Sequence, residues 1–210
     1  MQVYRLVARP GWGSVIVEAQ LDWYGLPFTI EPVGDLLRDA DSRKGLDKIN
    51  PLAQVPTLIL PDGTVMTESA AITLLLADQP AKQSLVPGPD APERAAFLRW
   101  LVFIVANIYP TFTYADVPAR FIEVEAARAP FVATIDAYRQ KLWRQLEDQA
   151  GAPWFLGGRF SALDIFIAVM TRWGPKRPWF EKETPKLAAI ARAVDGLPQL
   201  ADMWKRNTPS

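Results

Sequence analysis

The chain has 210 residues and half of them are hydrophobic, which is enough to bury a sizeable core in one large domain or two small ones. Its 23 basic residues are balanced by 23 acidic ones, so no bulk charge attracts it to nucleic acid. It contains no cysteine and no histidine, which excludes a thiolate nucleophile, an imidazole base and an ordinary zinc site. We therefore expect no metal.

The first residues lack the charged and then apolar profile of a signal peptide, and the apolar runs are too short and interrupted to span a bilayer. We therefore expect a cytoplasmic protein with neither a membrane nor a nucleic-acid partner.

The first eighty residues are predicted to alternate strands and helices. Strands are expected at 3–8 and 28–33, and the helix between them begins with Ser14 as N-cap and ends at Gly25. The polar segment 36–47 is predicted to be a weak short helix or a loop. The segment after it has a clearer pattern, that of a β-hairpin.

The hairpin has two short apolar strands, Thr57–Leu60 and Thr64–Met66, joined by a Pro-Asp-Gly turn. A helix with Ser69 as N-cap comes directly after it. The predicted order is βαβαββα, which favours a small mixed sheet with helices on its faces.

The segment Gln79 to Pro92 contains four prolines and interrupts all periodicity, which is typical of a linker. We accordingly predict one domain at 1–80, a linker at 81–91 and a second domain at 92–210. Every later signal is helical. The predicted helices are 93–109 stopped by Pro110, one from about 123 or 130 to 149, 162–172, 184–193 and 197–206.

The start of the helix at 162–172 has the pattern of a capping box. Ser161 is its N-cap, Asp164 at the third helical position can reach back to it, and Phe160 can pack against Ile165 as a hydrophobic staple. This pattern indicates a buried helix.

Residues on both sides of the hairpin have the chemistry to hold a peptide-like ligand. An N-cap at Ser69 would offer free backbone N–H groups to a carboxylate, and Glu68 could hold an ammonium. If the peptide bond before Pro56 is cis, the backbone N–H and C=O of Val55 are free to pair with an extended ligand.

Gln54-Val55-Pro56 followed by Glu68-Ser69 resembles the glutathione-binding signature of the glutathione transferase family. The resemblance implies a thioredoxin-like α/β N-terminal domain, an all-helical C-terminal domain and a homodimer. It also implies a cis Val55–Pro56 bond, pairing of the Val55 backbone with the cysteinyl part of glutathione, and binding of the γ-glutamyl end by Glu68 and Ser69. Gln54 would face the glycyl carboxylate, with a cation from Arg38, Arg43 or Lys44.

The residue that activates the thiol departs from the family's pattern. Cysteine-type members would have their cysteine at Gly13, many serine-type members their serine nearer Gly11, and tyrosine-type members a tyrosine close to Val7. Ser14 is therefore the candidate catalytic residue, by elimination. The alternative is that backbone N–H groups around Gly11 and Gly13 face the sulfur.

The resemblance implies a transferase, active in detoxification, that adds the glutathione thiolate to an apolar electrophile, with glutathione as co-substrate. Two alternatives stay open. One is other glutathione chemistry, such as peroxide reduction, disulfide exchange or isomerisation, and the other is a non-catalytic binding protein with the same fold. The aromatic candidates for the electrophile pocket, of which we expect only two or three to line it, are Trp12, Tyr109, Phe112, Tyr114, Trp173 and Trp179.

Overall fold

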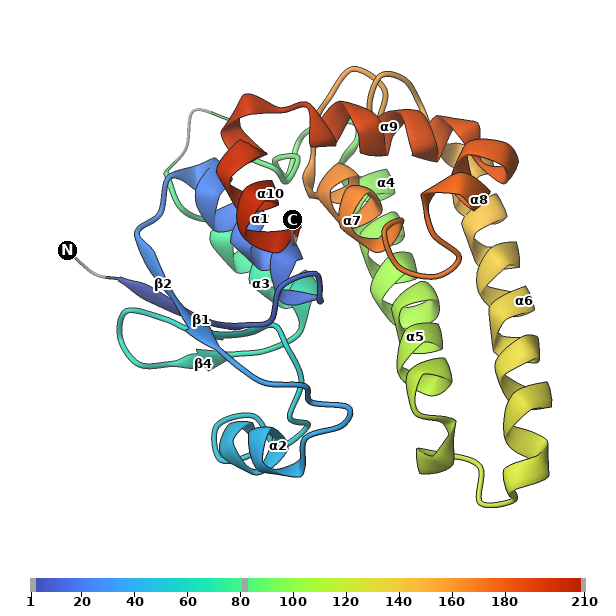
Figure 1. The fold of residues 1–210 in the computed structure, drawn as a ribbon. Helices are drawn as coiled ribbons and strands as arrows, with labels where there is room; N and C mark the ends of the chain where they lie inside the picture. Colours follow the sequence, from blue (N-terminus) through green and yellow to red (C-terminus); the bar gives the residue numbers. More distant parts are fainter. Residues whose placement is uncertain (1–2, 81–82, 209–210) are drawn as a thin grey trace. The chain divides into compact units, whose positions relative to one another are not determined.

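A computed structural model describes residues 3–80 and 83–208, and its first part has the predicted order βαβαββα (Figure 1). The polar segment forms a short helix rather than a loop. Ala81 and Lys82 of the predicted linker lie outside the described residues. The elements of this first part are β1 (Tyr4–Ala8), α1 (Ser14–Tyr24), β2 (Phe28–Pro32), α2 (Ala40–Leu46), β3 (Thr57–Ile59), β4 (Val65–Met66) and α3 (Ser69–Leu76).

The sheet has four strands in the order β2-β1-β3-β4. β1 is parallel to β2, with Leu6 opposite Ile30, and antiparallel to β3, with Leu6 opposite Leu58. β4 pairs with β3 at the edge. Since successive side chains of a strand point to opposite faces, the inner strand β1 must be covered on both sides.

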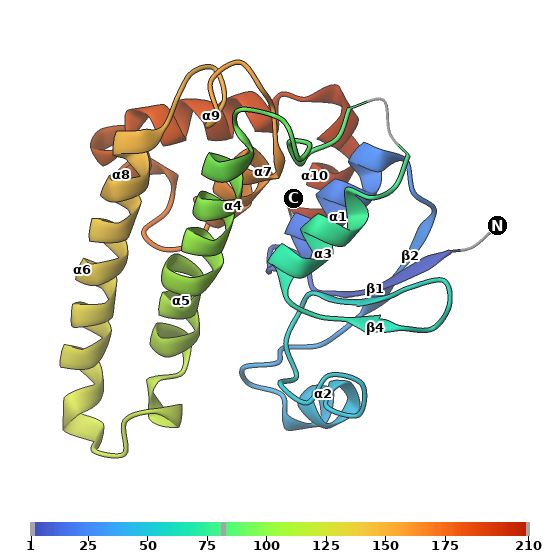
Figure 2. The same ribbon diagram turned by 180° about the vertical axis from the view of Figure 1, so that it is seen from behind.

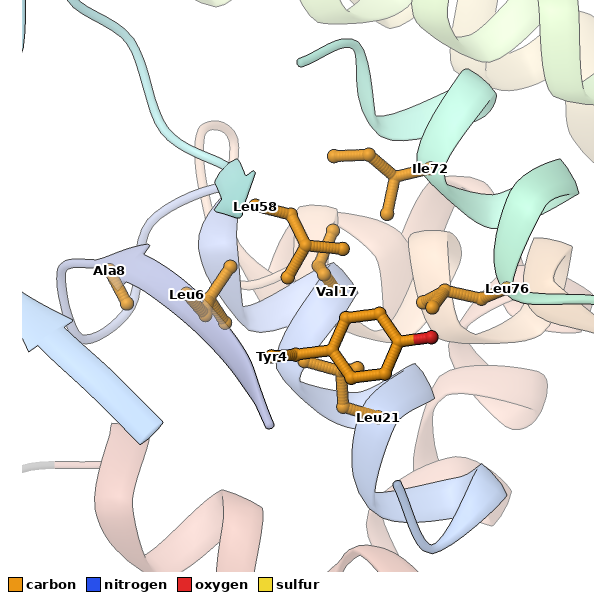
Figure 3. Close-up of a cluster of buried hydrophobic side chains, with 8 residues drawn as sticks. All are labelled: Tyr4, Leu6, Ala8, Val17, Leu21, Leu58, Ile72 and Leu76. Atoms are coloured by element: carbon orange, nitrogen blue, oxygen red, sulfur yellow. The ribbon is translucent and has the colours of Figure 1, made fainter. Parts of the chain in front are cut away.

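Helices α1 and α3 cover one face of the sheet (Figure 3). Val17 and Leu21 lie one turn apart on α1, so both face the sheet, and α3 repeats this spacing. A hydrogen bond of 2.9 Å from Gln20 Nε2 to Thr73 Oγ1 joins the two helices. The buried cluster on this face is Tyr4, Leu6, Ala8, Val17, Leu21, Leu58, Ile72 and Leu76.

A second buried cluster lies on the opposite face, where Val7 of β1 points. Trp12, in the loop after β1, packs against this cluster. The cluster therefore brings the first loop together with the segment that carries the predicted binding residue Val55. Its members are Val7, Leu36, Leu46, Ala53, Val55 and Ile59.

The chain divides into two compact units, and the sheet unit contains both the first and the last of the described residues. It comprises the described residues of Met1–Pro87 and Arg192–Ser210, and Gly88–Ala191 form the other unit. In the sheet unit, helix α10 (Ala201–Asn207) packs against α1 (Figures 1 and 2). The domain limits 1–80 and 92–210 stay a prediction.

The described residues of the second unit contain only helices, as predicted. Helix α8 was not predicted. Helix α6 begins close to the earlier of the two predicted starts and contains Pro130. The helices from residue 88 to 195 are α4 (Arg94–Phe103), α5 (Tyr109–Asp116), α6 (Glu125–Gln149), α7 (Ala162–Met170), α8 (Arg177–Glu183) and α9 (Pro185–Asp195), with a 3₁₀ turn at Pro118–Arg120.

The prediction that Pro110 stops a helix is wrong. Between α4 and α5 the chain forms a π turn, Ile104–Ile108, so the helical run continues through Pro110, which lies in the first turn of α5. The wider π turn accommodates a residue that has no N–H and whose ring would clash in a regular helix. By length and composition alone the run Arg94–Asp116 could cross a membrane, but here it packs against α6.

The predicted capping box of α7 is present, and Ser161 and Asp164 are both completely buried. The backbone N–H and the hydroxyl of Ser161 donate to Asp164 Oδ2 at 2.8 and 3.2 Å, and the N–H of Phe155 donates to Oδ1 at 2.7 Å. Burial raises the pKa of Asp164 to about 7, although these hydrogen bonds oppose the rise.

The raised pKa of Asp164 makes the stability of the helical unit depend on pH. Between about pH 4 and pH 7 the unfolded chain has released this proton while the folded chain retains it. The free energy of unfolding therefore falls as the pH rises, by up to about 1.4 kcal/mol per pH unit. Asp164→Asn should lack this slope. Urea unfolding of both proteins from pH 4 to 8 measures it, and parallel curves would contradict the prediction.

Candidate functional site

The backbone of Val55 is the central feature of the candidate site. The Val55–Pro56 peptide bond is cis, as the resemblance implied. Val55 is only 9% exposed, and within residues 3–80 and 83–208 nothing forms a hydrogen bond with its N–H or C=O. Buried peptide groups almost always have partners, so this pair is available to an extended ligand that supplies its own C=O and N–H.

Asn50, which the sequence pattern did not single out, shapes the loop that presents Val55. It is 3% exposed, and its Nδ2 donates to Gln54 O at 3.0 Å and to Thr57 Oγ1 at 2.9 Å. Its Oδ1 accepts the N–H of Leu52 at 3.1 Å. The last bond is an Asx turn, and the Asn-Pro pair was the local signal that could have revealed it.

Glu68 adopts a left-handed backbone conformation with φ 63° just before α3. Outside glycine such a conformation is uncommon, costs of order 1–3 kcal/mol and clusters at ligand-binding sites. The carboxylate is exposed, and only the hydroxyl of Thr67, at 3.5 Å, donates to it among the described residues. It can therefore receive an ammonium group.

Helix α3 begins at Ser69, so the prediction that Ser69 is the N-cap is wrong and Glu68 occupies that position. The first backbone bond of the helix runs from Ile72 N–H to Glu68 O at 3.0 Å. In the described part of the chain, the N–H groups of Ser69, Ala70 and Ala71 have no acceptor. Despite the shift, these donors and the helix dipole still favour a carboxylate here.

The loop between β1 and α1 is a tight turn at Pro10 and Gly11. Trp12 N–H donates to Arg9 O at 3.1 Å and Gly11 has φ 76°, the arrangement of a type II turn. Ser14 closes the turn, because its hydroxyl donates to Arg9 O and accepts from Arg9 N–H, both at 3.1 Å.

Ser14 is the first residue of α1 and Gly13 is the N-cap, so the predicted capping role of Ser14 is wrong. The side chain is completely buried and its hydroxyl already donates and accepts within the loop. This geometry argues against the predicted contact between the Ser14 hydroxyl and a thiol. By contrast, the N–H groups of Gly13 and Ser14 have no acceptor among the residues that the structure describes.

The three candidate cations of the α2 region differ in their partners. Arg43 Nη1 donates to Leu36 O at 3.2 Å, and Lys44 lies 3.7 Å from Asp41. Arg38 is exposed and forms no ion pair within the described residues. The side chain of Gln54 is also exposed. No cluster of three or more potential metal ligands occurs among the described residues.

The structure brings some of the predicted aromatic residues together. In the helical unit, Tyr109 and Trp173 are half-buried and in edge contact, with ring centroids 5.4 Å apart. Tyr114 instead contacts Phe121 at 5.1 Å. In the sheet unit, the guanidinium of Arg9 lies over the ring of Trp12, 5.0 Å from the centroid of that ring.

Comparison with known proteins gives the family. Over 201 residues the chain is 39% identical to the uncharacterized GST-like protein YncG of Escherichia coli (strain K12), covering 94% of this chain and 95% of that protein. The chain belongs to the glutathione transferase family. Residues 16–79 match the family model of the glutathione S-transferase N-terminal domain.

A second relative and a solved structure are also similar to this family member. Glutathione S-transferase GstA of Escherichia coli O157:H7 is 27% identical over 172 residues, covering 80% of this chain and 81% of GstA. A crystal structure of a glutathione transferase homolog from Sulfitobacter with bound glutathione superimposes with a TM-score of 0.82 over 98% of both chains, at 20% identity. The predicted family and its thioredoxin-like and helical fold are confirmed.

Proposed function

We propose that this protein binds glutathione in the sheet unit and conjugates its thiolate to an apolar electrophile. The observation that carries the proposal is the buried backbone of Val55, whose N–H and C=O have no partner among the described residues. The relative GstA, named a glutathione S-transferase, and the glutathione bound to the Sulfitobacter homolog support it.

Each part of glutathione has a matching group in the site. The γ-glutamyl ammonium pairs with Glu68, and its carboxylate receives the N–H groups of Ser69 and Ala70. The cysteinyl unit pairs with the backbone of Val55. Gln54 and a cation of the α2 region face the glycyl carboxylate. Arg38 is the best candidate for this cation, because it forms no ion pair among the described residues.

The thiol is activated by backbone amides rather than by a side chain. A thiol with a pKa near 8.5 is only about 3% ionised at pH 7, and lowering that pKa by about two units requires about 2.7 kcal/mol. The N–H groups of Gly13 and Ser14, which lack an acceptor in the described chain, are at the positive end of α1 and supply charge-assisted hydrogen bonds of this order. The hydroxyl of Ser14 instead holds the loop.

The electrophile is apolar because the side chains proposed to receive it are aromatic. Trp12 adjoins the amides of the first loop, and the pair Tyr109 and Trp173 offers an apolar surface in the helical unit. Tyr114, whose ring contacts Phe121, is a further aromatic side chain of the proposed electrophile site. The biological role that fits this chemistry is detoxification.

We propose that the protein is a cytoplasmic homodimer. Several large apolar side chains of the helical unit are exposed, including Val102 at 57% and Val124 at 66%. Exposed apolar groups of this size are common at subunit interfaces. Sedimentation velocity at several concentrations should show a species of twice the 23.4 kDa chain mass, and a monomer throughout would contradict this proposal.

Glu68→Ala should weaken glutathione binding by about 1 to 3 kcal/mol, because it removes the partner of the ammonium. The stability of the fold should change little, since the side chain is exposed. Asp78→Ala is the matched control, because it removes an acidic side chain near the other end of α3. Isothermal titration calorimetry measures both affinities, and equal affinities would refute the binding assignment.

The bound thiol should titrate about two units below its solution pKa in the wild type, and this shift should survive in Ser14→Ala. That variant should nevertheless be less stable by about 1 to 3 kcal/mol, since the N–H of Arg9 loses its acceptor. Thiolate absorbance near the ultraviolet edge, recorded against pH, gives the pKa. A return to the solution value in Ser14→Ala would show that the hydroxyl activates the thiol.

A further inference from the structure

The end of helix α10 joins α1 to the first loop within the sheet unit. Arg206 Nε donates to Glu18 Oε1 at 2.6 Å, and Asn207 Nδ2 donates to Glu18 Oε2 at 2.8 Å. Arg206 also pairs with Asp22, one turn further along α1. The last helix of the described chain therefore meets α1 at one carboxylate.

Glu18 is the anchor of this arrangement. Its side chain is 2% exposed, and a buried carboxylate is stable only when its oxygens have donors and its charge has a partner. Both oxygens receive a donor from α10. The position of Asn207 is consequently fixed by the carboxylate of Glu18, which is buried and cannot turn toward solvent.

The two flanking acceptors also determine how the amide of Asn207 is oriented. Glu18 Oε2 and Met203 O, the latter at 3.0 Å, can only accept, so the NH₂ group must face them. The Oδ1 of Asn207 then faces the first loop, where it accepts the N–H of Gly11 at 3.4 Å. This hydrogen bond is long, but Glu18 and Met203, which accept from the NH₂ group, fix the direction in which Oδ1 points.

Gly11 is the residue of the first loop whose left-handed backbone makes the turn. Ser14 holds one end of that turn at Arg9, and Asn207 holds it at Gly11, two residues before Gly13. We propose that Asn207 is a positioning residue, which holds the loop so that the N–H groups of Gly13 and Ser14 point at the glutathione sulfur. This inference rests on the proposed function.

The charged side chains near the loop are paired with opposite charges while α10 is in place. Arg9 is paired with Asp35 at 3.2 Å, so its charge is already balanced. Glu18 lies one turn of α1 after Ser14, and without Arg206 its negative charge would oppose a thiolate at the start of the helix. The remaining charged side chains of α10, Lys205 and Asp202, pair with each other at 2.9 Å.

Asn207→Leu tests the proposal, because leucine has a similar size but neither donates nor accepts a hydrogen bond. We expect the pKa of bound glutathione, read from thiolate absorbance, to rise by about one unit, so that the thiolate fraction at the wild-type midpoint falls about fivefold. Above about pH 9 the two proteins should converge. Lys205→Ala, on the same helix and pointing to solvent, should keep the wild-type pKa.

A purely structural role for Asn207 would lower the midpoint of urea unfolding and weaken glutathione binding without moving the thiol pKa, and this result would overturn the inference. If Asn207→Leu does not fold, Arg206→Lys replaces it. That variant keeps a cation beside Glu18 but loosens its geometry, and it must shift the pKa in the same direction.

The wild type separates this inference from the proposed function. A lowered thiol pKa in the wild type that persists in both variants would overturn only the role of Asn207. A wild-type complex in which the thiol keeps its solution pKa would overturn both the amide activation and the positioning role.

Discussion

The burial of strand β1 on both faces is the constraint on which the rest of the sheet unit depends. Leu6 packs under α1 and α3, while Val7 on the next position packs on the opposite side with Val55 and Ile59. Both layers are therefore required for stability. They also bring the start of α1 and the loop before β3 to the same strand, so the forces that stabilise the core assemble the site.

The site that results is built mainly from backbone groups. The proposed donors and acceptors are the peptide of Val55 and the amides at the starts of α1 and α3, to which Glu68 adds a charge for the ammonium group. Backbone groups are directed by the fold and not by side-chain identity. In the proposed function, a family member without cysteine and histidine, and with a buried serine, can therefore activate a thiol through backbone groups.

Side chains act in this site chiefly by shaping loops. Asn50 shapes the loop that presents Val55, Ser14 closes the turn after β1, and Asn207 reaches the same turn from the end of the chain. Each replaces a hydrogen bond that regular structure would otherwise provide. The buried Glu18 gives the last of these contacts its rigidity, because a carboxylate without its partners would be costly at that depth.

Several local features of this protein follow from its sequence alone. The hairpin turn and the capping box of Ser161 and Asp164 could be predicted, because each depends on residues a few positions apart, whereas the cis bond before Pro56 was implied by the family resemblance. Three other features depend on tertiary contacts: the Ser14 hydroxyl is occupied, Pro110 lies inside a helical run, and Arg206 neutralises Glu18. The last pair is 188 residues apart in sequence, and contacts at such a distance follow from how the elements pack and leave no local pattern.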